Sequence, residues 1–204
     1  MLSYHDLPSH KTVFIFELDH VLIPQKDYDL QVYYLFANFI EYLETFPLAT
    51  DVIAFMQNRY EAYGNTNMFL EVSQAFGIDK KYQENLELLY VNAKLPLKLL
   101  LYKEALELLQ ELVVNRKHVF ILTAGNPLQQ LNKITQTEWN GLDKYLKVYF
   151  KEELAAKFPY LRLSFILEEN KLVKDDIIII SNLESDRLLA IDFGIDFIIT
   201  TWQS

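Results

Sequence analysis

The chain has 204 residues, of which 51% are hydrophobic, and it contains no cysteine. This apolar content is too high for a disordered chain and is ordinary for a globular one. The length suits one compact domain, or a core domain that carries an inserted subdomain. Without cysteine the chain has no disulfides, no thiol nucleophile and no zinc–thiolate site.

The charge balance and the distribution of apolar residues limit the classes of partner. The chain has 28 acidic and 19 basic residues and a net charge of −9, with no basic patch in the sequence, so we expect no nucleic-acid partner. No apolar run approaches the ~18–20 residues that cross a bilayer, so we expect no membrane partner. The polar start, residues 1–11, resembles neither a signal nor a transit peptide. We therefore expect a cytoplasmic protein, either a monomer or a homodimer.

Five short runs of β-branched and aromatic residues are predicted to form buried strands. Most are apolar throughout, which favours a parallel sheet that is covered on both faces. The runs are Thr12–Phe16, His118–Thr123, Lys147–Phe150, Ile177–Ser181 and Phe197–Thr200.

Amphipathic segments separate the later strands and are predicted to be helices. Asn126 and Pro127 suit the N-cap and the first position of one of them. This alternation is typical of an open, Rossmann-like α/β sheet with right-handed crossovers. The predicted helices are Tyr102–Val113, Pro127–Thr137, Tyr160–Asn170 and Glu184–Phe193.

About 100 residues separate the first two strands, which is far more than one crossover needs. We interpret residues 25–97 as an inserted all-helical subdomain, and residues 1–24 and 98–204 as the core. Tyrosines 28, 33, 34 and 42 either line a ligand cleft or pack against the core domain. The four helix-like stretches are Tyr28–Glu44, Asp51–Tyr63, Asn67–Phe76 and Lys80–Ala93.

Polar residues follow the ends of the predicted strands. In open α/β sheets, ligands bind beyond the carboxyl ends of the strands. A hydroxyl at a helix N-terminus and a lysine favour an anion, whereas carboxylates suit a divalent cation. Together they suit a phosphate group with Mg²⁺. The residues are Glu17, Asp19, Thr123, Ala124, Lys157, Asn182 and Asp186.

Four segments resemble, in order, the motifs of the haloacid dehalogenase (HAD) superfamily, most of whose members are phosphatases. They are VFIFELDHVLIP, VFILTAGNPLQQLNKI, Lys157 before Phe158-Pro159, and IIIISNLESD. Asn182 follows Lys157 by 25 residues, a separation common in that family. The helical insertion stands where the family carries its C1-type cap, so the resemblance covers nearly the whole chain.

The resemblance assigns roles to these residues. Glu17 matches the nucleophile, Asp19 the general acid/base, and Lys157 the lysine that contacts phosphate and neutralises charge beside the nucleophile. Thr123 and Ala124 match the remaining phosphate-binding positions. The metal ligands implied for Mg²⁺ are Glu17, Asp19, Asn182 and Asp186.

Two of these positions depart from the family pattern. Glu17 replaces an aspartate, and moving the attacking oxygen by ~1 Å can cost on the order of 100-fold in rate. Asn182 also replaces an aspartate, so the implied Mg²⁺ loses a charged ligand and is bound weakly or lost.

We therefore expect a phosphatase-type hydrolase scaffold for a small phosphorylated molecule, with weak or absent turnover. The alternative is a non-catalytic pseudophosphatase that binds or senses a phosphorylated ligand. A metal-independent dehalogenase is a weaker hypothesis, which rests on the Ser181-Asn182 pair. The four scattered histidines show no ligand spacing, so we expect no zinc site.

Overall fold

The computed structural model describes residues 2–157, 162–200 and 202, and these divide into two compact units. The core unit consists of the described residues up to 24, residues 100–130 and the described residues from 137 onward. The helical unit consists of Gln25–Leu99 together with Leu131–Gln136. Within the described part of the chain, no helix is both long enough and apolar enough to span a membrane.

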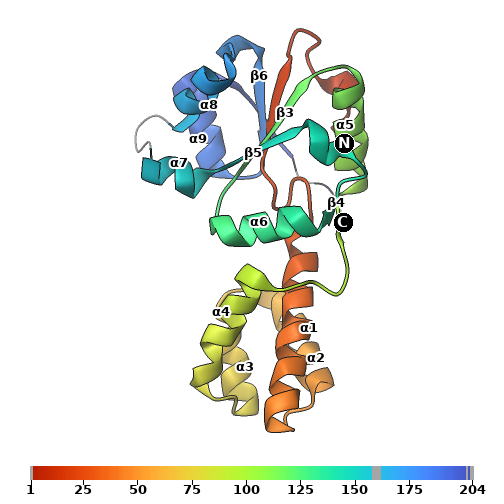
Figure 1. The fold of residues 1–204 in the computed structure, drawn as a ribbon, viewed down its shortest axis with the longest axis vertical. Helices are drawn as coiled ribbons and strands as arrows, with labels where there is room; N and C mark the ends of the chain where they lie inside the picture. The colour runs from red at the N-terminus through yellow and green to blue at the C-terminus, as the bar shows by residue number, and fades with distance from the viewer. Residues whose placement is uncertain (1, 158–161, 201, 203–204) are drawn as a thin grey trace. The chain divides into compact units, whose positions relative to one another are not determined.

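The core unit is built on a five-stranded parallel sheet (Figure 1). The strand order β5-β3-β1-β6-β7 places the first strand of the chain at the centre. In register, Phe16 lies beside Ile121 on one side and Ile180 on the other. The strands are Val13–Phe16 (β1), His118–Thr123 (β3), Leu146–Phe150 (β5), Ile177–Ser181 (β6) and Asp196–Ile199 (β7). The α/β fold expected from the sequence is therefore confirmed.

Helices cover both faces of this sheet, on opposite sides in Figure 1. One face packs the alternate residues Val13, Ile15, Ile177 and Ile179 against apolar side chains of α7, α8 and α9. Helix α5 lies on the other side, as the period-two alternation of strand side chains requires. The helices are Lys103–Val114 (α5), Lys151–Lys157 (α7), Arg162–Asn170 (α8) and Glu184–Phe193 (α9).

Helix α6, Pro127–Gln136, begins in the core unit, and its second half belongs to the helical unit. The Asn126 side chain accepts a hydrogen bond from the Leu128 N–H at 2.9 Å, which is the predicted N-cap. The sequence did not predict α7 or the two-residue strands Leu99–Leu100 (β2) and Thr137–Glu138 (β4). These elements are too short to show a clear hydrophobic period.

The helical unit contains the four predicted helices. In the first helix, buried residues recur every three or four positions, among them Tyr28, Val32, Tyr33 and Phe36. The tyrosines divide between two environments: Tyr28 and Tyr33 are fully buried, whereas tyrosines 34 and 42 are exposed. The helices are Gln25–Glu44 (α1), Ala49–Tyr63 (α2), Met68–Phe76 (α3) and Gln83–Asn92 (α4).

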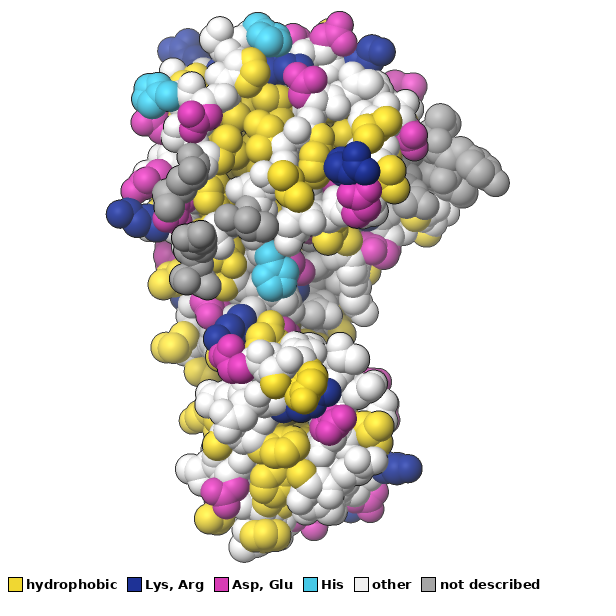
Figure 2. Space-filling model, turned by 180° about the vertical axis from the view of Figure 1, so that it is seen from behind, with side chains coloured by type: hydrophobic (Ala, Val, Ile, Leu, Met, Phe, Trp, Pro, Cys, Tyr) yellow, Lys and Arg dark blue, Asp and Glu magenta, His cyan; other side chains and the backbone are white. Residues whose placement is uncertain are grey.

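The molecular surface mixes apolar and charged side chains. On the face shown in Figure 2, hydrophobic side chains lie in small groups among acidic and basic ones. Apolar atoms cover more than half of most folded proteins, so such groups are ordinary. They do not by themselves mark a binding site.

Candidate functional site

The candidate site lies at the carboxyl edge of the parallel sheet, and Glu17 is at its centre. Glu17 directly follows β1 and is only 3% exposed. Since β1 is the central strand, residues that follow β3, β5 and β6 can reach it from both sides. The structure thus brings Glu17 together with Thr123 and Asp186, three of the predicted site residues.

The Glu17 carboxylate is surrounded by hydrogen-bond donors. Thr123 Oγ1 donates to Glu17 Oε1 at 2.5 Å, and the Leu18 N–H donates to the same oxygen at 2.9 Å. The Ala124 N–H lies 3.3 Å from both carboxylate oxygens. Lys151 Nζ donates to Glu17 Oε2 at 2.7 Å. Four residues thus form an anion seat, which is filled by a carboxylate of the chain itself.

Lys151 links Glu17 to a second buried acid. Its Nζ lies 2.6 and 2.8 Å from the two carboxylate oxygens of Asp186. Asp186 Oδ2 also accepts a hydrogen bond from Ser181 Oγ at 2.6 Å. Two carboxylates therefore share one ammonium in a site that is largely shielded from water, where each ionic interaction is stronger than at the surface.

Burial and ion pairing act in opposite directions on Glu17. Loss of hydration raises the pKa of its carboxyl group above the ordinary value of 4.5. The Lys151 ammonium and the hydrogen bonds from Thr123 and Leu18 lower the same pKa, but burial is the larger effect. The Glu17 carboxylate is therefore held at some cost in hydration free energy, and it is easier to protonate than a glutamate in water.

Asp19 lies on the tight turn that follows β1. Gln130 Nε2 donates to Asp19 Oδ2 at 2.8 Å and also to the Ala124 carbonyl, so one amide fixes the acid and the loop after β3. The sequence did not single out Gln130. Its position one turn into α6 is the only signal that places it near the loop.

Lys157 does not occupy the place that the sequence predicted for it. Its side chain is 68% exposed, and its Nζ lies 4.0 Å from Glu153 on the same helix. Lys151, six residues earlier, is the lysine that reaches Glu17. The signal for Lys151 was available, because Lys151 directly follows a predicted strand. The separation of 25 residues and the following Phe158-Pro159, which lie outside the described residues, favoured Lys157 instead.

The Gly125 N–H, which follows Ala124 in the loop after β3, also has a carboxylate partner. It donates to Glu152 Oε1 at 2.7 Å. Gly125 has a φ of +103°, a backbone conformation that residues other than glycine rarely adopt. A Cβ added at this position would lie 3.3 Å from Gln130 Nε2. Acids of the chain therefore take the backbone N–H groups of Ala124 and Gly125 in this loop.

The donor set does not fit a Mg²⁺ ion in this arrangement. The Lys151 ammonium already lies between the carboxylates of Glu17 and Asp186. Among the described residues, no group of three acidic or histidine side chains could hold a metal. One feature points the other way: Asn182 Oδ1 is buried and has no hydrogen-bond partner within the described part of the chain. A single neutral oxygen is a weak ligand set for Mg²⁺.

The sequence matches no protein-family model and, at a significant level, no curated protein. Solved structures do match. A dehalogenase solved with an intermediate complex has a TM-score of 0.55 at 15% identity, over 97% of this chain and 88% of its own. A protein from Clostridium difficile assigned to the phosphatases has a TM-score of 0.53 at 15% identity, over 93% and 85%. A HAD hydrolase from Bacillus subtilis, solved with bound magnesium, has a TM-score of 0.54 at 15% identity, over 92% and 85%.

These likenesses extend over nearly the whole chain and concern the fold. The chain has the α/β fold of the HAD hydrolases, as the order of its motifs led us to expect. At 15% identity they carry no information about substrate or catalytic rate.

Proposed function

We propose that this protein is a HAD-type hydrolase that binds a small phosphomonoester at the carboxyl edge of its sheet and hydrolyses it slowly. The observation that carries the proposal is the anion seat around Glu17. A hydroxyl, a backbone N–H and an ammonium converge there on one anionic group. The same three kinds of donor bind phosphoryl oxygens in proteins.

Slow turnover follows from what fills the seat. The Glu17 carboxylate takes the hydrogen bonds of Thr123 and Ala124 and the charge of Lys151. A phosphate group has to displace this carboxylate before it can bind. Hydrogen bonds to charged groups contribute about 1.5–3 kcal/mol each, so an internal competitor lowers substrate affinity by at least an order of magnitude.

The residues have the following roles in the proposed reaction. A Glu17 carboxylate oxygen attacks phosphorus, the bond from phosphorus to the ester oxygen breaks, and Asp19 gives a proton to the departing alkoxide. Water then attacks the acyl phosphate, Asp19 takes a proton from it, and phosphate leaves with Glu17 regenerated. Lys151, and not Lys157, supplies the positive charge beside the nucleophile. Gln130 orients Asp19 through the 2.8 Å hydrogen bond.

The test is a hydrolysis assay on a panel of small phosphomonoesters, with and without millimolar Mg²⁺. Orthophosphate binding is measured on the same protein by calorimetry. We expect orthophosphate binding and slow phosphate release that exceeds the release by an Asp19→Asn variant. Binding without release above that variant would reject the hydrolase part of the proposal. Absence of both would reject the phosphate site altogether.

A further inference from the structure

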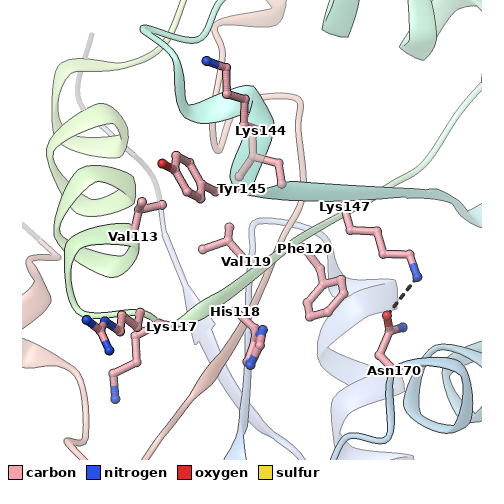
Figure 3. Close-up of a pocket in the computed structure, with 11 residues that line it drawn as sticks. Val113, Lys117, His118, Val119, Phe120, Lys144, Tyr145, Lys147 and Asn170 are labelled. Atoms are coloured by element: carbon pink, nitrogen blue, oxygen red, sulfur yellow. Dashed lines mark hydrogen bonds between the residues drawn. The ribbon is translucent and has the colours of Figure 1, made fainter.

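A cavity lies at the opposite edge of the same sheet from the seat around Glu17. It has a volume of about 520 Å³, within the usual range for small-molecule sites. It opens at the amino ends of β3 and β5, next to the end of α5 (Figure 3). Strand β3 runs five residue steps from His118 to Thr123, so the two sites lie about 16 Å apart along the strand. The cavity is therefore separate from the seat around Glu17.

All the charged side chains that line this cavity are basic, although the chain as a whole has a net charge of −9. They come from two segments, the turn before β3 and the residues that lead into β5. No acidic side chain is among the lining residues. The charged residues are Arg116, Lys117, Lys144 and Lys147, and His118 also lines the cavity.

Two of these cations are engaged within the protein. Lys117 Nζ donates to the carbonyl of Lys11 at 2.6 Å and to that of Ser9 at 3.2 Å. Lys147 Nζ donates to Asn170 Oδ1 at 2.9 Å, as Figure 3 shows, and lies 3.3 Å from Glu169. These contacts fix the walls of the cavity.

The side chains of Arg116 and Lys144 make no hydrogen bond or ion pair with any of the residues described here. Both side chains are exposed. Two cations on separate segments thus border one cavity without a carboxylate between them. Each of them is therefore available to pair with an anion that enters the cavity.

Arg116 has a left-handed backbone conformation, as have five other residues of the described chain that are not glycine. Its φ of +57° is left-handed, which costs a residue other than glycine roughly 1–2 kcal/mol. The position is the second after the end of α5 and follows the C-cap Asn115, where glycine is the common choice. An arginine is present there even though glycine would be less strained.

The cavity also has an apolar part. Val119 and Phe120 are buried beneath it, and Val113 and the Tyr145 ring lie on one side of it (Figure 3). The Tyr145 side chain is 60% exposed. An aromatic ring that is open to solvent beside unpaired cations suits a ligand with both a flat apolar body and a negative charge.

We propose that this cavity binds a small organic anion with an aromatic or apolar body, held by Arg116 and Lys144 through its charge and by Tyr145 through its ring. The anionic group is a phosphate, sulfonate or carboxylate, because all three accept hydrogen bonds from guanidinium and ammonium groups. The proposal does not depend on catalysis at Glu17.

The test uses 1-naphthalenesulfonate, which is not a phosphomonoester and so is not hydrolysed at the site around Glu17; the variants below show at which of the two sites it binds. Binding is measured by calorimetry at low salt, beside inorganic sulfate for the charge alone and 1-naphthol for the ring alone. We expect the sulfonate to bind about tenfold more tightly than either. We also expect roughly tenfold weaker binding in 0.5 M salt, because exposed charges are screened.

The decisive variant is the double change Arg116→Ser and Lys144→Ser. We expect it to lose at least tenfold in sulfonate affinity, with thermal stability and phosphomonoester hydrolysis unchanged. Lys103→Ser, which removes an 82% exposed lysine of the core unit, is the matched control and should leave binding as it is. Tyr145→Ala should weaken binding of the sulfonate and leave that of sulfate unchanged.

Equal sulfonate affinity in the double variant and in Lys103→Ser would overturn the proposal. So would equal affinities for the sulfonate and 1-naphthol, because the charge would then contribute nothing. Loss of phosphomonoester hydrolysis with sulfonate binding intact would count against the proposed function alone.

Discussion

The change Glu17→Asp tests whether the glutamate side chain occupies its own anion seat. Aspartate is shorter by one methylene, so the carboxylate withdraws by about 1.5 Å, the length of one C–C bond. The Thr123 hydroxyl now lies 2.5 Å from Glu17 Oε1, and withdrawal takes that distance to about 4 Å, beyond hydrogen-bond range. The Ala124 N–H, now at 3.3 Å, loses the carboxylate as well.

Glu17→Asp should lower the stability of the protein and strengthen its binding of orthophosphate. We expect the free energy of unfolding to fall by about 1.5–3 kcal/mol, because one strong hydrogen bond to a buried carboxylate is lost. The donors of Thr123 and Ala124 become available to phosphate oxygens. The same 1.5–3 kcal/mol, gained on binding, corresponds to roughly 10- to 100-fold tighter binding of orthophosphate.

Urea denaturation and calorimetric titration with orthophosphate measure the two effects. The control is Thr123→Val, made both in wild type and in Glu17→Asp, because it removes the hydroxyl that donates either to Glu17 or to phosphate. It should lower the stability of wild type and lower the phosphate affinity of Glu17→Asp. The reasoning is refuted if Glu17→Asp is destabilised while its phosphate affinity does not rise. That result would mean that the Glu17 carboxylate does not compete with the ligand.

Three further predictions concern the charges of the site. Lys151→Met should lower the free energy of unfolding by about 3–5 kcal/mol, because two buried carboxylates lose their counter-ion. Lys157→Met should change the free energy of unfolding by less than about 0.5 kcal/mol, because its side chain is exposed. Equal effects of the two variants in chemical denaturation would contradict the placement of the two lysines. The raised pKa of Glu17 means that the folded state binds a proton more tightly than the unfolded state, so the stability contributed by Glu17 is present below about pH 4.5 and declines as the pH rises through the folded pKa. The stability of wild type relative to Glu17→Gln should therefore decrease with rising pH in urea titrations between pH 4.5 and 8, and an increase would show that the Lys151 pair outweighs burial. The melting temperature of Asn182→Asp should rise measurably when 10 mM Mg²⁺ is added, whereas that of wild type should rise little. An equal rise in both proteins would mean that wild type already has a competent metal site.

Much of the fold was readable from local pattern. The strands are continuous apolar runs because both faces of a parallel sheet are buried, and this property belongs to each segment by itself. The rule that polar residues at strand ends gather at one edge correctly brought together Glu17, Thr123 and Asp186, which lie as far as 169 positions apart in the chain. The helical insertion was equally visible, since its residues show a helical period and no strand-like run.

Tertiary structure decided which lysine reaches the site. Lys151 and Lys157 differ by six residues, which in a helix means about 9 Å along the axis and about 240° around it. Whether a lysine faces Glu17 therefore depends on where the helix begins, and α7 begins directly after β5. Sequence spacing alone does not fix that starting point.

The sequence by itself determined the strands, their helical crossovers and the edge of the sheet where polar groups collect, because each is encoded within a short segment. Only the tertiary structure showed that the Glu17 carboxylate fills the seat formed by Thr123 and Ala124, and that Arg116 and Lys144 border one cavity. The first depends on distances of a few ångströms between groups from different segments, and the second on how the turn before β3 and the residues before β5 lie beside each other. Such distances are set by the packing of the whole core and not by any local pattern.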